Sequence, residues 1–177
     1  EIHERLVGSE MCIRDRYRMY EDTAAILGEY GFHQYEISNY AKKGLECRHN
    51  KGYWQRTDYL GLGLGASSLV DHVRFSNTDN MEEYLRNSAF PEKIRCDRET
   101  LTEADEMAEF MFLGLRMTEG VSVREFEEYF GKNMESIYGE VLKKHFALGM
   151  LKKKNDRIFL TRRGIHVSNG VMADFLL

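Results

Sequence analysis

The chain has 177 residues, of which 42% are apolar, so it can build one domain or two small ones around a hydrophobic core. Its net charge of −4 and isoelectric point near 5.9 argue against a general phosphate-binding protein. No apolar run is long enough to predict a membrane span, and no apolar h-region predicts a signal peptide. Cys12, Cys47 and Cys96 are widely spaced and odd in number, which predicts free thiols and a cytoplasmic location.

Residues 1–16 read EIHERLVGSEMCIRDR and have no clean helical or strand period. The run SEMCIRDR resembles a spurious translated tail of the kind found fused to fragmentary gene models. We therefore interpret residues 1–16 as a non-native tail. The natural chain is expected to start near Tyr17, with its true N-terminal part missing.

Residues 17–38 predict a helix followed by a strand. Tyr20, Ala24 and Leu27 repeat at helical spacing, and Gly31 is placed to end the helix. The next stretch, residues 32–38, alternates apolar and polar side chains as a strand does. A helix, a glycine and a strand in this order form half of a βαβ repeat, which predicts a parallel sheet.

The stretch from 39 to 97 predicts short elements around a long loop. Residues 39–57 read as an irregular connection, whose histidine and aromatic residues indicate function rather than disorder. After it the pattern predicts a strand over residues 59–64, a small-residue turn over 63–68, a strand over 70–76, a helix over 80–87 and a linker over 88–97.

From Arg98 the sequence predicts dense helix. The predicted elements are helices over residues 102–117, 122–131 and 134–148, a hairpin over 151–160 turning at Asn155 and Asp156, and a last helix over 161–177. In the third helix the residues expected to face inward are Ile137, Val141, Leu142 and Leu148. Three helices, a hairpin and a closing helix predict a winged-helix-like module.

Gly61, Gly63 and Gly65 leave three main-chain positions without side chains. Such a loop can approach a nucleotide or an adenosyl group through its N–H groups. A tight turn that relieves crowding is the more common reason for such glycines, and a lone glycine-rich turn is a weak signal.

The run HNKGYW is a sharper candidate. His49 supplies an imidazole, a standard iron ligand, and Tyr53 and Trp54 can line a porphyrin face. In the structural alternative, His49 and Asn50 bond to the loop backbone while the two aromatic rings plug the sheet. From the residues alone this alternative is favoured. Cys47 and His49 together cannot complete a zinc site, which needs four ligands.

Several segments carry a resemblance to a known family. They are YEISNYA (Tyr35–Ala41), CRHNKGYW (Cys47–Trp54) with YLGLGLGASS (Tyr59–Ser68), MFLGLRMTEGVS (Met111–Ser122) and LTRRGIHVSNGVMADFL (Leu160–Leu176). Through them the chain from about Tyr17 resembles the C-terminal half of the oxygen-independent coproporphyrinogen III oxidase-like proteins of the radical-SAM superfamily. The match is nearer to the haem-chaperone branch (HemW type) than to the oxidases.

The resemblance implies an α/β fold. Residues 17–97 would form the C-terminal part of a partial TIM-type barrel, and residues 98–177 a small winged-helix-like α+β domain of the HemN C-terminal type. It implies haem as a ligand, with S-adenosylmethionine and a [4Fe–4S] cluster in the full-length parent. The family's Cys-x-x-x-Cys-x-x-Cys motif is absent from this sequence. The chain alone is therefore not expected to cleave S-adenosylmethionine, and we interpret it as a C-terminal fragment without catalytic residues or cluster ligands.

The resemblance also implies site residues. His49 becomes the expected haem ligand, and the rest of its haem-binding loop is Asn50, Tyr53 and Trp54. The expected main-chain contacts to the adenosyl part of S-adenosylmethionine fall on Gly65, Ala66 and Ser67.

The expected function is that of a radical-SAM haem chaperone fragment, whose parent binds haem and delivers it to acceptor haem proteins. One alternative is the oxidase itself, which decarboxylates two propionates by a radical route. Another is a winged-helix nucleic-acid binder, against which the 12 basic and 13 acidic side chains of residues 98–177 argue. A truncated barrel leaves a strand edge unpaired, so self-association is also expected.

Overall fold

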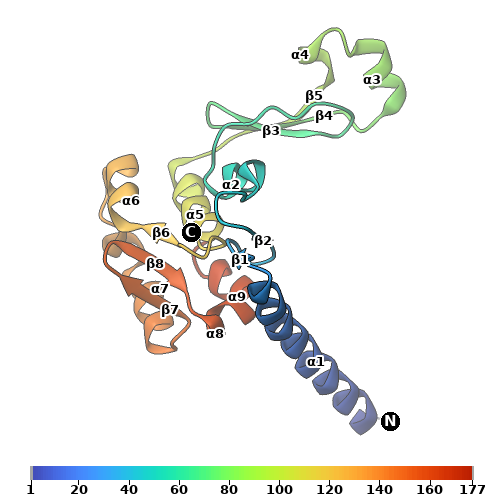
Figure 1. The fold of residues 1–177 in the computed structure, drawn as a ribbon. Coiled ribbons are helices and arrows are strands. Elements are labelled where there is room, and N and C mark those ends of the chain that lie inside the picture. Colours follow the sequence, from blue (N-terminus) through green and yellow to red (C-terminus); the bar gives the residue numbers. More distant parts are fainter. Residues whose placement is uncertain (1, 177) are drawn as a thin grey trace.

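The computed structural model describes residues 2–176 (Figure 1). The first part of the chain holds α1 (Ile2–Glu29), β1 (His33–Gln34), β2 (Tyr40–Ala41), α2 (Arg48–Trp54), β3 (Ser67–Val70), β4 (Val73–Asn77), α3 (Met81–Asn87), α4 (Pro91–Ile94) and β5 (Arg95–Thr100). The second holds α5 (Glu103–Gly114), β6 (Val121–Ser122), α6 (Val123–Phe130), α7 (Met134–Ala147), β7 (Leu151–Lys154), β8 (Arg157–Leu160), α8 (Arg162–His166) and α9 (Ser168–Ala173).

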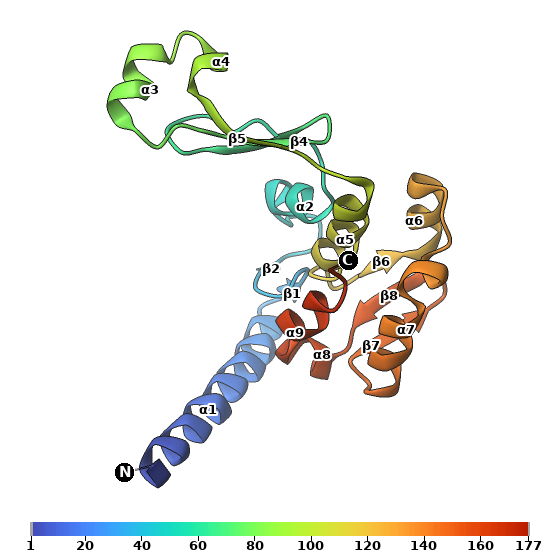
Figure 2. The same cartoon turned by 180° about the vertical axis from the view of Figure 1, so that it is seen from behind.

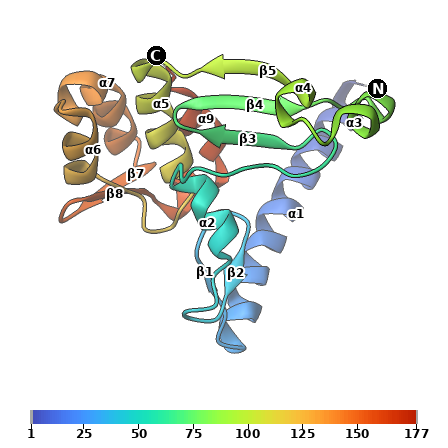
Figure 3. The same cartoon turned by 90° about the horizontal axis from the view of Figure 1, so that it is seen from above.

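The molecule has a helical body from which two arms extend. Figures 1 and 2 show α1 and the β3–β5 sheet projecting in different directions from the body of α5–α9, with α2 between the sheet and α5. Seen from above, the sheet and its helices α3 and α4 lie apart from the hairpin β7–β8 (Figure 3). None of the helices described over residues 2–176 is long and apolar enough to cross a membrane.

Helix α1 starts earlier than predicted. It begins at Ile2 instead of near Tyr17, so residues that we expected outside the fold continue the same helix. Its end is as predicted, because Gly31 adopts a φ of 77° just after Glu29. The carboxylate of Glu21 accepts hydrogen bonds from Arg162 at 2.8 Å and lies 2.9 Å from His166 Nε2, which ties α1 to α8. The non-native origin of residues 1–16 stays a prediction.

The sheet after α1 is antiparallel, not parallel as predicted. Strand β1 pairs with β2, with His33 opposite Ala41, and every strand pair within residues 2–176 is antiparallel. The chain turns back at once after β1, where the Tyr35 amide donates to the Asn39 carbonyl at 3.2 Å. A parallel neighbour would require a crossover segment at this point, and the tight return leaves no room for one.

The connection predicted to be irregular over residues 39–57 contains a helix. Helix α2 covers Arg48–Trp54. Its N-cap residue is Cys47, whose side chain makes no capping hydrogen bond to the first turn. The helix also contains Gly52, a poor helix former. Sequence signals for a helix are therefore weak here, and tertiary contacts described below hold it in place.

The second sheet has the strand order β3-β4-β5. The predicted strand over residues 59–64 is wrong, because within it only Tyr59 pairs, with Leu69, and Leu62 is 85% exposed. The predicted strand over 70–76 becomes a hairpin whose turn residues, Asp71 and His72, have positive φ. The predicted helix over 80–87 is confirmed as α3, capped by Asn80. The predicted linker over 88–97 contains α4 and the start of β5.

The C-terminal body has the helix order and hairpin of a winged helix, as predicted. Its strands follow the order β6-β8-β7. Thr102 and Asp105 form the predicted capping box of α5, and Gly131 ends α6 in the left-handed conformation. The predicted last helix is instead two short helices that meet at Val167, whose ψ of 24° interrupts the regular helix. Leu177, its predicted end, lies outside the described residues.

This body has one hydrophobic core. Its buried members are Met107, Met111, Leu115, Val121, Phe126, Phe130, Met134, Tyr138, Leu142, Leu151, Ile158, Leu160, Val171, Met172 and Phe175. Of the α7 residues predicted to face inward, Leu142 is buried and Ile137 and Val141 pack against the core. Leu148 is 46% exposed, contrary to prediction, because it lies at the end of the helix just before Gly149 turns the chain with a φ of 67°.

A short backbone ladder joins the two parts of the chain. The Ile37 amide donates to the Arg116 carbonyl at 3.0 Å, and the Thr118 amide donates to the Tyr35 carbonyl at 3.1 Å. The segment after α5 therefore pairs with the segment between β1 and β2. Both segments belong to motifs that suggested the family resemblance.

Gly120 is a position where only glycine fits. Its φ is 68°, and an added Cβ would lie 2.0 Å from the Ile158 carbonyl oxygen in β8. We expect Gly120→Ala to lower the free energy of unfolding by about 2–4 kcal/mol, through backbone strain and overpacking. Gly139, inside α7 with no atom within 4 Å of an added Cβ, is the matched control. Gly139→Ala should stabilise by about 0.5–1 kcal/mol. Urea unfolding measures the unfolding free energy of both variants. Equal effects of the two substitutions would contradict the claim that position 120 requires glycine.

Candidate functional site

Helix α2 brings the four residues of the predicted haem loop together on two neighbouring faces. Residues four apart share one face of a helix, so His49 lies beside Tyr53 and Asn50 beside Trp54. The rings of His49 and Tyr53 meet edge to face with centroids 4.5 Å apart. The two faces have different surroundings.

The face with His49 is open to solvent. His49 is exposed, and no side chain that the structure describes bonds to its ring nitrogens. Tyr53 stacks edge to face on Tyr59 at 4.5 Å. A hollow of about 160 Å³ lies alongside, and its lining is Arg48, His49, Gly52, Tyr53, Thr57, Asp58 and Tyr59. An imidazole beside two phenol rings in a shallow hollow can offer a ring nitrogen to a metal in a flat ligand.

The face with Trp54 is turned to the protein. The Asn50 amide donates to the Tyr35 hydroxyl at 3.5 Å. Trp54 packs against the small cluster of Tyr35, Ala41 and Met117, and the guanidinium carbon of Arg116 lies 4.2 Å from its ring centroid. These contacts resemble the structural alternative weighed for the motif. A direct contact of Asn50 or Trp54 with haem stays a prediction.

The residues that hold this face were missed as site residues. Glu36 is completely buried, and its Oε1 accepts from the Ser38 amide at 2.8 Å and the Asn39 side chain at 2.6 Å. Its Oε2 lies 3.6 Å from Arg116. The segments YEISNYA and MFLGLRMTEGVS contain Glu36 and Arg116, and sequence reasoning used both only as markers of the resemblance.

The glycine-rich turn is held by its own hydrogen bonds. The Gly65 amide donates to the Thr78 carbonyl at 3.0 Å, and the Ala66 amide to the Gly63 carbonyl at 3.4 Å. The Asn77 side chain donates to the Gly63 carbonyl at 2.8 Å. Two of the three amides predicted to bind S-adenosylmethionine are thus engaged, and Ser67, the third residue, begins β3. The turn fits the structural alternative, and the cofactor contacts stay a prediction.

The described residues do not fit an iron–sulfur cluster. Cys47 and Cys96 have free thiols on separate elements, and Cys12 lies outside the described side chains. No group of three His, Cys, Asp or Glu side chains among the described residues could hold a metal ion. A cluster of this kind needs several thiolates close together.

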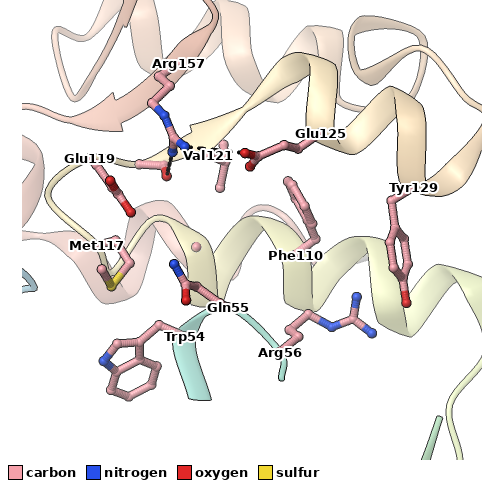
Figure 4. A pocket seen from close by; sticks show the side chains of 12 residues that line it. Trp54, Gln55, Arg56, Phe110, Met117, Glu119, Val121, Glu125, Tyr129 and Arg157 are labelled. Atoms are coloured by element: carbon pink, nitrogen blue, oxygen red, sulfur yellow. Dashed lines mark hydrogen bonds and ion pairs between the residues drawn. The ribbon is translucent and has the colours of Figure 1, made fainter. Parts of the chain in front are cut away.

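A cavity lies at the junction of α2, α5 and α6. It measures about 190 Å³ and, as Figure 4 shows, the end of α2 with Trp54 and Arg56 forms one wall while Tyr129 of α6 lines another. Arg157 closes a third side, donating to the Gly120 carbonyl at 3.0 Å and pairing with Glu125 at 3.5 Å. Arg56, Glu125 and Arg157 of its lining already have ion-pair partners, so the cavity is a joint between the two parts more than a binding site.

A second set of charges crosses this joint. Arg56, 9% exposed, pairs with Glu106 at 3.0 Å and Glu109 at 3.4 Å, both on α5. Arg74 of β4 also pairs with Glu109, at 2.5 Å, and His72 bonds to Glu106. The hydrogen bond to Glu106 raises the pKa of His72 above its usual value. The two glutamates are nearly buried, so they depend on these cations.

Two lysines of the winged-helix body are neutralised within the domain. On α7, Lys144 pairs with Asp174 at 2.5 Å, and Glu135 pairs with Lys153 of the hairpin at 3.6 Å. Cations that are neutralised within the domain do not make a phosphate-binding stripe. The nucleic-acid alternative gains no support.

Comparisons with known proteins agree with the resemblance. Residues 101–167 match the family described as the HemN C-terminal domain. The chain is 36% identical over 159 residues to the "Heme chaperone HemW" of Lactococcus lactis and 35% identical over 161 residues to that of Bacillus subtilis. These matches cover 90% and 89% of this chain and 41% and 42% of the relatives. The chain thus spans about two fifths of the length of these relatives.

Two further matches extend the comparison. The zebrafish "Radical S-adenosyl methionine domain-containing protein 1, mitochondrial" is 32% identical over 131 residues, 69% of this chain and 30% of the relative. Among solved structures, that described as "Coproporphyrinogen III oxidase (HemN) from Escherichia coli is a Radical SAM enzyme" is similar with a TM-score of 0.69. It is 17% identical and the match covers 88% of this chain and 39% of that one, which confirms the predicted fold class. The domain limits 17–97 and 98–177 stay predictions.

The contact of His72 with Glu106 should depend on pH. Because the folded pKa of His72 is raised, its stabilising effect is fully present below the unfolded pKa, near 6.5, and is lost as the pH rises through the folded pKa. The His72 side chain is 59% exposed, so the difference in unfolding free energy between the natural chain and His72→Gln should stay under about 1 kcal/mol. Urea unfolding at several pH values tests this. NMR titration should show the pKa of His72 falling in Glu106→Gln, and no change there would contradict the contact.

Proposed function

This chain belongs to the haem-chaperone (HemW) branch of the coproporphyrinogen III oxidase-like family, and on that premise we propose that it supplies the haem-binding surface of a haem chaperone. The observation that carries the proposal is the His49 imidazole, exposed on a helix whose other face is fixed to the protein. Tyr53 and Tyr59 stand beside it as partners for the flat face of a porphyrin. Iron in haem is commonly held by a histidine nitrogen.

The hollow beside His49 is shallow, which suits a ligand that is transferred to another protein. Pockets that enclose a drug-sized ligand have volumes of about 300–1,000 Å³. The hollow beside His49 measures about 160 Å³, so haem bound there keeps much of its surface outside the chain. An acceptor haem protein can then contact the haem before His49 releases it.

The remaining parts of the proposal concern the longer parent. We assign S-adenosylmethionine and the [4Fe–4S] cluster to the part of the relatives that this chain does not span. The oxidase alternative requires radical chemistry from those groups, and no contact within residues 2–176 favours it. The parent is placed in the cytoplasm, with haem and acceptor haem proteins as its partners.

Replacing His49 tests the proposal directly. Haem is titrated into the natural chain and into His49→Ala, and the Soret band is followed. A histidine-bound haem should give a band shifted from that of free haem, and His49→Ala should lose the shift and bind about tenfold or more weakly. His33→Ala is the matched control, because His33 is another exposed histidine that lies outside α2. Equal binding by the natural chain and His49→Ala would refute the proposal.

Replacing Gly52 should raise the stability of the chain and lower its affinity for haem. Gly52 is helical, its φ is not positive, and an added Cβ would only touch Thr57 at 3.7 Å, so the fold does not require glycine there. We expect Gly52→Ala to stabilise the chain by about 0.5–1 kcal/mol while weakening haem binding, since the new methyl group narrows the hollow beside His49. Gly139→Ala should give the same gain in stability with unchanged haem binding. Thermal unfolding measures the change in stability and the Soret titration the change in haem affinity. Unchanged haem affinity in Gly52→Ala would show that haem does not occupy the hollow beside His49.

A further inference from the structure

Helix α2 and the C-terminal domain meet at a partly buried cation, Arg116. Arg116 follows α5 in the C-terminal domain, yet its guanidinium carbon lies 4.2 Å from the ring centroid of Trp54 in α2. A guanidinium stacked on an indole is among the stronger cation–π contacts, and it is strengthened where water is excluded. Arg116 is 25% exposed, so this contact is largely shielded.

The position of Arg116 is itself fixed. Glu36, fully buried, lies 3.6 Å away and supplies the opposite charge. The other oxygen of Glu36 is held by the Ser38 amide and the Asn39 side chain. The backbone of Arg116 accepts the Ile37 amide at 3.0 Å. The backbone of Arg116 is therefore held by a hydrogen bond, while its guanidinium faces Glu36 across 3.6 Å as an ion pair without a hydrogen bond and meets the indole on α2.

The stack is one of the contacts that hold α2, together with the ion pairs of Arg56 just after the end of the helix. Trp54 is on the anchored face and His49 on the open face of a helix of only seven residues, with no side-chain cap at its start. Such a short helix has little stability of its own, so its orientation follows its tertiary contacts. Its anchored face is held by the Trp54 ring, which lies on Arg116 and packs against Tyr35, Ala41 and Met117, and by the Asn50–Tyr35 hydrogen bond.

We propose that Arg116, with Glu36 behind it, is a positioning residue for haem binding: it stacks on Trp54 and so orients α2 to present His49 to the iron. This inference rests on the proposed function. Neither residue touches the hollow beside His49, so they act through the helix. The C-terminal domain thereby becomes part of the haem site without contacting the ligand.

A double-mutant cycle on the full 177-residue chain tests the inference. The effect of His49→Ala on the haem dissociation constant, followed by the Soret band, is measured in the natural chain and in Glu36→Gln/Arg116→Met. The paired substitution removes both charges, so no buried carboxylate is left uncompensated. We expect His49→Ala to weaken binding about tenfold or more in the natural chain and less than about threefold in the paired variant, because His49 is no longer held in place.

A matched control separates positioning from stability. Arg157 is another arginine of the same domain, and it bonds to Gly120 and Glu125 without contacting α2. Arg157→Ala should leave the effect of His49→Ala near its full size, even where the unfolding temperature falls as far as in the paired variant. A role of Arg116 in stability alone would leave the His49→Ala effect intact in every folded variant.

Trp54→Leu provides the second route if the paired variant does not fold. It keeps an apolar side chain among Tyr35, Ala41 and Met117 while removing the aromatic face. It should reduce the His49→Ala effect to less than about threefold, as the paired variant does. A full effect of His49→Ala in Trp54→Leu or in the paired variant overturns the positioning role and leaves the proposed function standing. No effect of His49→Ala in the natural chain refutes the proposed function itself.

Discussion

Arg116 contacts Glu36 on one side and Trp54 on the other, and so joins α2 to the C-terminal body. A fully buried carboxylate is costly unless a cation accompanies it, and Arg116 is the cation nearest to Glu36. That requirement fixes the segment after α5 against the segment after β1. The indole then packs on the guanidinium of the same cation. The charge of Glu36 thus helps to bring together three segments that are far apart in the sequence, those of Glu36, Trp54 and Arg116.

A second charged joint acts in parallel. Arg56 leaves the end of α2 and enters between Glu106 and Glu109 of α5, while Arg74 meets Glu109 from the β4 strand. Hydrophobic packing contributes less at this joint, where the apolar cluster found among the described residues is small and consists of Tyr35, Ala41 and Met117 with Trp54 beside it. The C-terminal body has a large core of its own. The first part of the chain therefore depends on ionic contacts with the second for much of its order.

Sequence patterns predicted the C-terminal body well because its signals are local. Capping residues such as Thr102 and Ser122, and glycines such as Gly131, mark helix ends through bonds within a few residues. The first part was predicted less well because its elements depend on distant partners. Helix α2 has no cap and contains a glycine, and β5 is mostly polar and pairs through its backbone. Its motif predicted His49 as a haem ligand, but only the structure shows that Asn50 and Trp54 face the protein.

The stacked joint has a consequence for the molecule when it carries its ligand. Linked equilibria are reciprocal: whatever free energy the joint contributes to haem binding, bound haem returns to the joint. If haem binds at His49 as proposed, a loaded chain therefore holds its two parts together more tightly than an empty one. An acceptor that pulled α2 away from Arg116 would loosen the grip on the iron at the same moment. On this proposal, the contact between the Trp54 indole and the Arg116 guanidinium controls the release of haem, and separating these two groups is enough to weaken haem binding.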